Sequence, residues 1–228
     1  MLIGILQTGQ SPDVLRAEAG DYPDMFARLL ANRGLGFRSY HVEGDDFPAS
    51  VHDCEGWLVT GSRHGAYEEH RFIPRLEAFL REAYAAAVPI VGICFGHQIL
   101  AQALGGKVEQ FGGGWAVGPQ DYDFSGETVT LNAWHRDQVT KLPPGAKVIA
   151  SNPFCAYAGL AYGDRALSVQ AHPEFSDAFV EGLLRSRGPG LVPEPLMQAA
   201  RARLGTPNGA AAIADRIAAF FKRPRNTP

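Results

Sequence analysis

The most informative part of this chain for its fold and chemistry is the stretch Val88-Pro-Ile-Val-Gly-Ile-Cys94-Phe-Gly-His-Gln-Ile-Leu-Ala101. The apolar run from Val88 to Ile93 is typical of a buried strand, and a helix-forming run covers Gln98 to Leu104. Between them lies Gly92-Ile-Cys94-Phe-Gly96, the pattern of a nucleophile elbow with cysteine in the serine position. The glycines make room for a sharp turn, which leaves Cys94 at a helix N-terminus that favours the thiolate. The pattern predicts a cysteine that attacks a carbonyl.

A base for this cysteine is available downstream, where the apolar run from Ala166 to Gln170 ends in Ala171-His172-Pro-Glu174. Residues two apart in an extended segment point the same way, so His172 and Glu174 can face one site. The imidazole would take the thiol proton, and the carboxylate would hold the imidazole. Alone, a His-Pro-Glu triplet is more often a solvated strand end, and a buried cysteine is more often a core residue. The two motifs together favour catalysis.

At these residues the chain resembles the class I (Cys-His-Glu triad) glutamine amidotransferases. The matching stretches are Gly92-Ile-Cys94-Phe-Gly-His97-Gln98, Gln170-Ala-His172-Pro-Glu174-Phe and, with less specificity, Val59-Thr60-Gly61-Ser62. They fall in the family's order and cover the span from Leu2 to Arg187. The resemblance implies a flavodoxin-like fold and hydrolysis of a γ-glutamyl amide through a γ-glutamyl thioester on a cysteine.

The resemblance also implies a role for each residue of the triad. Cys94 would be the nucleophile, His172 the base and Glu174 the group that orients the base. The small-molecule substrate would be glutamine or a γ-glutamyl peptide or conjugate, and no cofactor would take part.

Further residues are implied around the triad. The backbone N–H of Phe95 and one from Gly61 or Ser62 would form the oxyanion hole. This agrees with the physical expectation for an elbow, which uses the residue after the nucleophile and a nearby loop. Gln98 would help to bind the amino-acid end of the substrate.

One departure from the family pattern and one further similarity concern the substrate. Ala171 stands where family members often carry Phe, and a small residue there widens the expected site. The stretch Asn132-Ala-Trp-His135-Arg136-Asp137-Gln-Val is similar to the place where relatives line the substrate's α-amino and α-carboxylate groups. This similarity makes His135, Arg136 and Asp137 candidate substrate contacts. The motif is most similar to that of the stand-alone, GMP-synthase-like branch of the family, which includes γ-glutamyl peptidases. For Arg136 the competing interpretation is a solvated surface arginine.

The amino-acid composition of the chain limits the classes of protein to which it can belong. With 228 residues and 46% hydrophobic content, the chain can bury a large core as a single domain. A net charge of −3 and the lack of Lys/Arg runs argue against a nucleic-acid or membrane surface. The N-terminal stretch lacks a secretory signal pattern, and three scattered cysteines argue against a disulfide framework. We therefore expect a cytoplasmic protein.

Strand and helix patterns alternate along the chain and predict a three-layer α/β fold, a mostly parallel open sheet with helices on both faces. The main expected strands and helices are 2–6, 23–32, 37–42, 57–60, 73–87, 88–93, 98–104, 147–150, 156–161 and 166–170. Residues 107–117 and 128–131 are typical of hairpin strands. Thr60 to Ser62, Cys94 and His172 all follow strand ends, which is where open α/β sheets bind ligands.

We expect residues 1–190 to form the amidotransferase-like domain, and 191–228 to be a C-terminal helical extension of it with a short disordered tail from Arg223. Helices are predicted over Pro195 to Leu204 and Ala210 to Lys222. The apolar stripe of the second helix is typical of core packing, and a homodimer face is the less common interpretation.

No metal site is expected. His41, His52, His64 and His70 lack metal-ligand spacing, and loop histidines among carboxylates are commonly solvated. Neither a phosphate-binding Gly-x4-Gly-Lys-Ser/Thr nor a Gly-x-Gly-x-x-Gly pattern is present, so nucleotide chemistry is not expected. His97 is not favoured as the base, because its helix directs the side chain along the helix axis.

Three hypotheses on function remain. The first is a stand-alone hydrolase of glutamine or of a γ-glutamyl peptide or conjugate. The second is a glutaminase subunit that delivers ammonia to a separate synthetase partner, since the chain carries no nucleotide-binding module. The third is a catalytically silent binding module, against which the intact Cys94, His172 and Glu174 argue.

Overall fold

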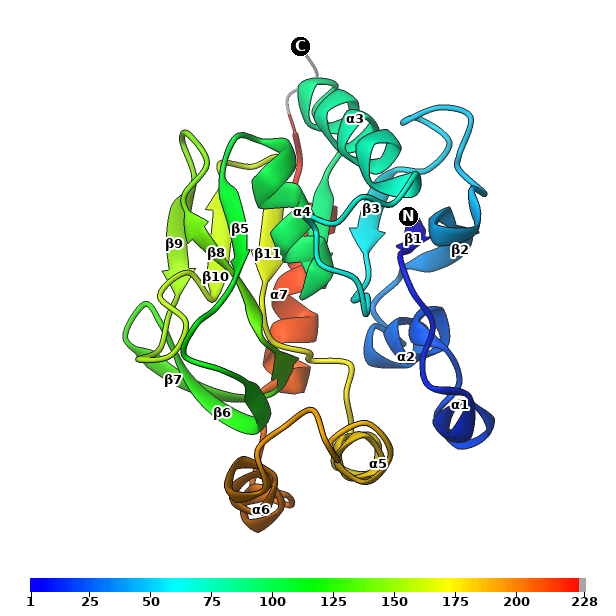
Figure 1. Cartoon of the computed structure of the whole chain (residues 1–228). Helices are drawn as coiled ribbons and strands as arrows, with labels where there is room; N and C mark the ends of the chain where they lie inside the picture. Colours follow the sequence, from blue (N-terminus) through cyan, green and yellow to red (C-terminus); the bar gives the residue numbers. More distant parts are fainter. Residues whose placement is uncertain (226–228) are drawn as a thin grey trace.

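A seven-stranded sheet forms the centre of the computed structural model, which describes residues 1–225 (Figure 1). Its strands are β1 (Leu2–Gln7), β2 (Gly36–His41), β3 (Gly56–Val59), β4 (Ile90–Ile93), β9 (Lys147–Ala150), β10 (Gly159–Tyr162) and β11 (Ala166–Val169). They lie in the order β2-β1-β3-β4-β11-β10-β9. Neighbours from β2 to β11 are parallel, and β10 and β9 are antiparallel at one edge. The mostly parallel α/β sheet expected from the sequence is confirmed.

Helices lie on both faces of this sheet, and Figure 1 shows α3 and α4 in front of it and α7 behind. The helical segments are α1 (Asp13–Ala19), α2 (Tyr22–Leu29), the short 3-10 helix η1 (Val42–Gly44), α3 (Phe72–Ala85), α4 (Phe95–Ala103), α5 (Asp177–Ser186), α6 (Glu194–Arg203) and α7 (Ala210–Lys222). One buried cluster joins Trp57 of β3 to Leu80 of α3, and a second joins Ile5 of β1 to Ile217 and Phe221 of α7. Strands β3 and β4 are buried along their whole length, because helices cover both of their faces.

The expectation that residues 107–117 and 128–131 form hairpin strands is wrong in which strands pair with each other. Strand β6 (Ala116–Phe124) pairs with β7 (Glu127–His135), while β5 (Lys107–Gln110) pairs with β8 (Asp137–Lys141). The turn of the hairpin is Ser125-Gly126, whose φ angles of 54° and 96° are those a two-residue turn needs to match the strand twist. This turn signal sets the register, and the glycines at 112–114 separate β5 from β6.

The C-terminal part packs onto the sheet. The apolar face of α7, including Ile213, Ile217 and Phe221, is buried within this chain, so the core interpretation holds and this stripe is not a homodimer face. This packing supports our proposal that residues 191–228 extend the same domain. Of the tail expected to be disordered, Arg225 donates hydrogen bonds to the carbonyls of Phe220 and Phe221, and residues 226–228 lie outside the described residues. Within residues 1–225, no helix has the length and hydropathy to cross a membrane.

Candidate active site

The elbow predicted around Cys94 is present between β4 and α4. Cys94 has φ 53° and ψ −105°, a strained conformation that a non-glycine residue rarely adopts and that is typical of a nucleophile elbow. A Cβ on Gly92 would collide with the carbonyl oxygen of Gly96, and a Cβ on Gly96 would collide with the carbonyl oxygen of Val59. Both positions therefore require glycine, as the sequence pattern indicated.

Three strand ends bring the predicted residues together at one edge of the sheet. Thr60 follows β3, Cys94 follows β4 and His172 lies just beyond β11, and these strands are adjacent and parallel. The Cys94 N–H donates to the carbonyl of Val169 at 2.9 Å, and the His172 N–H donates to the carbonyl of Asn132 at 2.8 Å. The hairpin strand β7 thus fixes the segment that carries the histidine.

His172 and Glu174 form a buried pair beside this elbow. Nδ1 of His172 lies 2.7 Å from Oε1 of Glu174, and their side chains are 4% and 0% exposed. Phe175 stacks on the imidazole, with the ring centroids 3.9 Å apart and the planes 5° from parallel. A bond in the ring plane and a stack on the ring face leave His172 little rotational freedom. The sequence analysis included Phe175 in a matching motif without assigning it this contact.

The pair also sets the protonation of His172. Burial alone would lower the pKa of this imidazole, but the neighbouring Cys94 and the Glu174 carboxylate outweigh burial and raise it to about 10. His172 is therefore an imidazolium at neutral pH, next to Cys94. An imidazolium beside a cysteine is the environment in which a thiolate is stabilised.

The loop after β3 is fixed by a threonine pair. The hydroxyls of Thr8 and Thr60 both donate to the carbonyl of Gly61 at 3.0 Å, which fixes the peptide plane that carries the Ser62 N–H. The carbonyl of Thr60 accepts from the Gly96 N–H at 3.1 Å, so this loop and the elbow are tied together. A Cβ at Gly61 would lie 2.9 Å from Cε1 of His172, which shows how closely the loop approaches the imidazole.

Two glutamines connect the elbow to strand β8. Nε2 of Gln98 donates to the carbonyl of Asp137 at 2.8 Å and to Oε1 of Gln170 at 3.2 Å. Gln170 in turn places Nε2 at 3.7 Å from Sγ of Cys94. The sequence analysis did not single out Gln170 as a site residue. Its only signal was its place in the motif that ends in His172.

The candidate substrate residues at 135–137 lie at the same site. His135 is buried, its Nδ1 lies 3.2 Å from the carbonyl of Asp137, and burial lowers its pKa to about 3, so it is neutral. The Asp137 carboxylate accepts from the Tyr67 hydroxyl at 3.2 Å. Nε of Arg136 is buried and, among the described residues, has no hydrogen-bond partner. Because this donor is buried and unpartnered, Arg136 does not fit the interpretation as a fully solvated surface arginine.

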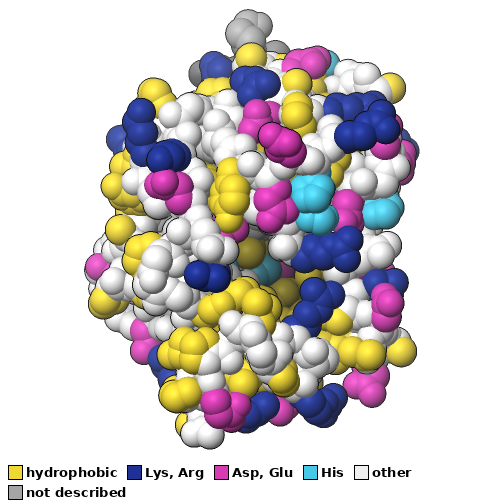
Figure 2. All heavy atoms as spheres, in the orientation of Figure 1, with side chains coloured by type: hydrophobic (Ala, Val, Ile, Leu, Met, Phe, Trp, Pro, Cys, Tyr) yellow, Lys and Arg dark blue, Asp and Glu magenta, His cyan; other side chains and the backbone are white. Residues whose placement is uncertain are grey.

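A cavity of about 290 Å³ opens above these residues. Figure 2 shows this face hollowed near its centre, with Lys or Arg, His and hydrophobic side chains around the hollow. Besides Cys94, Gln98, the 135–137 segment and His172, the cavity wall includes three groups that the sequence analysis did not assign. These are the aromatic side chains Tyr22, Trp115 and Trp134, the loop residues Arg63, His64, Tyr67 and Glu68, and the residue Arg187.

His97 and the other two cysteines take no part in this cavity. His97 is fully buried, its Nδ1 lies 2.8 Å from the Ser168 hydroxyl, and burial lowers its pKa to about 3. Burial raises the pKa of Cys54 and raises that of Cys155 to about 12. Their burial outside the cavity supports the interpretation of these residues as structural.

Comparisons with known proteins identify the family of this chain. A model of the glutamine amidotransferase class-I family matches residues 26–178. Gamma-glutamyl peptidase 4 of Arabidopsis thaliana is 31% identical over 175 residues, which cover 69% of each chain. A glutamine-hydrolysing GMP synthase of Bordetella parapertussis is 35% identical over 179 residues, covering 68% of this chain and 33% of that protein.

A solved structure described as a glutamine amido transferase from Methylobacillus flagellatus superposes with a TM-score of 0.76. It is 24% identical and covers 96% of this chain and 91% of its own, so it supports the fold. The family model and the relatives lead to one assignment. The chain belongs to the class I glutamine amidotransferase family, which makes it a hydrolase or amidotransferase.

Proposed function

We propose that this chain hydrolyses the γ-amide bond of a γ-glutamyl donor through a covalent thioester on Cys94, with His172 as base and acid and Glu174 as its orienting carboxylate. The observation that carries the proposal is the strained elbow at Cys94 with the buried His172–Glu174 pair beside it. The pair leaves Nε2 of His172 free for the cysteine, because Nδ1 is bonded to the carboxylate.

In the first step the Cys94 thiolate attacks the γ-carbonyl carbon of the donor and forms a tetrahedral oxyanion. The backbone N–H groups of Phe95 and of Gly61 or Ser62 are our candidates to stabilise that oxyanion. The Thr8 and Thr60 hydroxyls support this role, since they fix the loop on which two of these donors lie. Collapse breaks the C–N bond, and the leaving amine takes its proton from the His172 imidazolium.

In the second step water attacks the thioester carbonyl. His172, which is now neutral, takes a proton from the attacking water. Collapse of the second oxyanion then releases glutamate and restores the starting state, with the His172 imidazolium beside the Cys94 thiolate. Glu174 holds one ring orientation through both steps and stabilises each imidazolium. The net reaction adds one water and releases ammonia or an amine.

For the amino-acid end of the donor we propose Gln98, Asp137 and Arg136. The Gln98 amide N–H groups are committed to the protein, which leaves its Oε1 and the Asp137 carboxylate to accept from an α-ammonium group. The Arg136 guanidinium, with its buried unpartnered Nε, suits the α-carboxylate. His135 supports this segment through the Asp137 carbonyl.

We propose a γ-glutamyl peptide or conjugate as donor in preference to glutamine. Arg63 and Arg187 add two further guanidinium groups to the cavity wall, and Trp115 and Trp134 add apolar surface. Glutamine has one carboxylate, and its leaving group is ammonia, which uses none of these groups. A γ-glutamyl amino acid carries a second carboxylate on its leaving amine, which Arg63 or Arg187 can pair with. The similarity to a gamma-glutamyl peptidase supports this choice.

A substrate panel tests the proposal. The purified chain is given glutamine and γ-glutamyl dipeptides with a free or an amidated carboxyl terminus, and released glutamate, ammonia and amine are measured. We expect the free-carboxyl dipeptides to have the highest kcat/KM and Cys94→Ala to abolish turnover. Equal rates for Cys94→Ala and wild type on every donor would refute the hydrolase mechanism and leave the silent binding module.

Arginine variants test the substrate contacts separately. Arg136→Ala should raise KM for every donor, while Arg187→Ala should raise KM for free-carboxyl dipeptides and leave glutamine unchanged. Arg185→Ala, an exposed arginine two residues from Arg187 and outside the cavity wall, is the matched control. If Arg185→Ala and Arg187→Ala behave alike, Arg187 does not pair with the second carboxylate, and if Arg63→Ala is also without effect, the second-carboxylate contact is wrong.

A glutaminase subunit with a separate synthetase partner is the second candidate function. It is favoured by the similarity to a GMP synthase, of which this chain spans about a third. Glutamine hydrolysis that appears only when a synthetase is added would support this candidate over the stand-alone hydrolase.

A further inference from the structure

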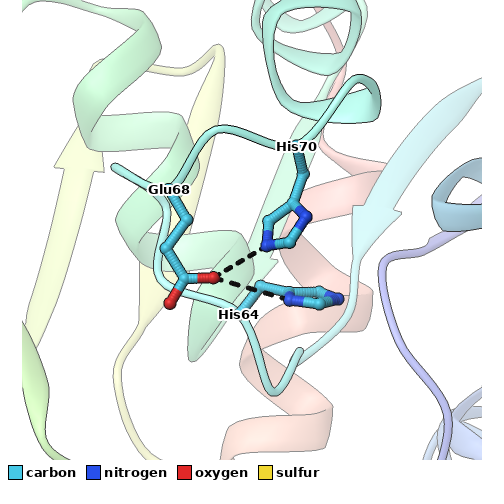
Figure 3. Close-up of side chains that lie close together, drawn as sticks. All are labelled: His64, Glu68 and His70. Carbon is cyan, nitrogen blue, oxygen red and sulfur yellow. Dashed lines mark hydrogen bonds and ion pairs between the residues drawn. The ribbon is translucent and has the colours of Figure 1, made fainter.

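The loop that joins β3 to α3 gathers three side chains of metal-binding types, His64, Glu68 and His70, of which His64 and Glu68 line the cavity. Oε2 of Glu68 lies 2.8 Å from Nε2 of His70 and 3.6 Å from Nδ1 of His64 (Figure 3). Figure 3 shows both imidazoles directed toward this carboxylate. Within residues 1–225, this is the one group of three or more His, Cys, Asp or Glu side chains whose ligand atoms all lie within 4.8 Å of one another.

A fourth side chain orients this group from a different part of the fold. Oε1 of Glu43, on η1, lies 2.8 Å from Nε2 of His64. The Glu43 carboxylate thereby fixes the His64 ring so that Nδ1 faces Glu68. Metal-ligating histidines commonly bond their second ring nitrogen to a carboxylate in this way, which holds the ring and raises its basicity. The Glu43 contact is a separate observation from the three-residue cluster, and it also indicates a metal-binding site.

We propose that His64, Glu68 and His70 bind a divalent transition-metal ion, with Zn²⁺ as the best match, and that Glu43 is the carboxylate that supports the site. Two imidazole nitrogens and one carboxylate oxygen are a donor set that zinc uses when it keeps a position open for water. Zn–N and Zn–O bonds near 2.0–2.1 Å place tetrahedral ligand atoms about 3.3–3.4 Å apart. The two spacings to Glu68, 2.8 and 3.6 Å, bracket that value, and all three ligand atoms lie within 4.8 Å of one another, so an ion can be bound after the side chains adjust.

The surroundings allow an ion to enter and to stay. Glu68 and His70 are 44% and 37% exposed, while His64 is 15% exposed. The His64 ring is tilted by 51° against the ring of His70, with the ring centroids 3.9 Å apart. The His70 ring also lies over Phe72 at the start of α3, with centroids 6.0 Å apart. An ion here would link η1, through Glu43 and His64, to the residues that lead into α3. It would restrain the loop that carries Gly61 and Ser62 and that forms one wall of the cavity.

Zinc binding to the Cys94→Ala protein tests the proposal, because that background removes the one cavity thiol that would also take the ion. Zn²⁺ is titrated in competition with a chromophoric chelator. We expect one equivalent to bind, and His64→Ala, Glu68→Gln and His70→Ala each to weaken binding by more than Glu43→Gln does. Loss of a supporting carboxylate reduces metal affinity by about tenfold to 100-fold. His52→Ala, which removes an exposed histidine elsewhere, should leave the affinity unchanged.

Cobalt supplies a second readout that does not depend on activity. Co²⁺ in place of Zn²⁺ should give visible absorption bands of a four- or five-coordinate site, and these bands should vanish in Glu68→Gln while far-UV circular dichroism stays the same. The proposal is overturned if the Cys94→Ala protein with an intact metal cluster binds no zinc. It is also overturned if the three ligand variants bind zinc as tightly as His52→Ala does. Neither result bears on the Cys94 mechanism, so the two proposals fail separately.

Discussion

Among single residues, Glu174 has the clearest consequence for reactivity, because it is the carboxylate on the buried imidazole. Replacing it by Gln keeps the shape and removes the charge that helps to raise the pKa of His172. We expect the His172 pKa to fall, as read from imidazole C–H shifts in NMR. We also expect kcat to fall by a factor on the order of 10³–10⁴, as in other hydrolases that lose this orienting charge. The exposed Glu82→Gln on α3 is the control, and an unchanged His172 pKa in Glu174→Gln would contradict the pairing.

The same pair gives stability a pH dependence with a defined sign. In the folded chain Cys94 and Glu174 together raise the pKa of His172 to about 10, against an ordinary value of about 6.5 in an unfolded chain. The folded state therefore binds the proton more tightly, and the interaction stabilises it fully below about pH 6.5 and is lost as pH rises through about 10. The wild type should exceed Glu174→Gln in unfolding free energy by an amount that shrinks across this window. Urea denaturation at several pH values measures it, and a growing difference would show the sign to be wrong.

At the scale of elements, the junction of β4 and α4 depends on close backbone approach. A methyl group at position 96 would collide with the main-chain carbonyl of Val59, and that strand cannot move without disturbing the sheet. Gly96→Ala should lower the unfolding free energy by about 1–3 kcal/mol or more. Gly112→Ala, where a Cβ meets nothing within 4 Å and φ is ordinary, should change it little. Chemical denaturation compares the two, and equal effects would mean that the elbow tolerates a side chain.

The elements that the sequence predicted well are those whose signals are local. The elbow was readable because Gly92, Cys94 and Gly96 are close in sequence and each answers a local steric demand. Strands β3 and β4 were readable as apolar runs, since both their faces are covered. The register of β6 and β7 was missed, because it depends on the Ser125-Gly126 turn and on packing against α6, where Gly118 meets Ala200. Helix α5 was also missed, although Ser176 caps it.

At the scale of the whole molecule, the sequence could nominate the candidate catalytic residues but not the residues that surround them. Cys94, His172 and Glu174 carry motif signals, and the fold brings them together. Tyr22 and Arg187 line the cavity, and Gln170 approaches Sγ of Cys94. These residues come from separate parts of the chain, so only the sheet order and the helices around it could place them. The His64, Glu68 and His70 cluster was set aside for lack of spacing, because its geometry comes from the fold of one loop and from Glu43 on another segment.

The last prediction concerns whether the C-terminal segment belongs to the same cooperative unit as the sheet. Phe221 of α7 is 1% exposed and packs in one cluster with Ile3 and Ile5 of β1, so its truncation leaves a cavity in the main core. Phe221→Ala should cost about 3–5 kcal/mol, and Ala212→Ser on the exposed face of α7 should cost far less. Because Trp57 lies in the cluster on the other face of the sheet, tryptophan fluorescence and far-UV circular dichroism should report one shared unfolding midpoint, shifted equally by Phe221→Ala. Two separate transitions, with only one moved by the substitution, would show that residues 191–228 fold as a unit of their own.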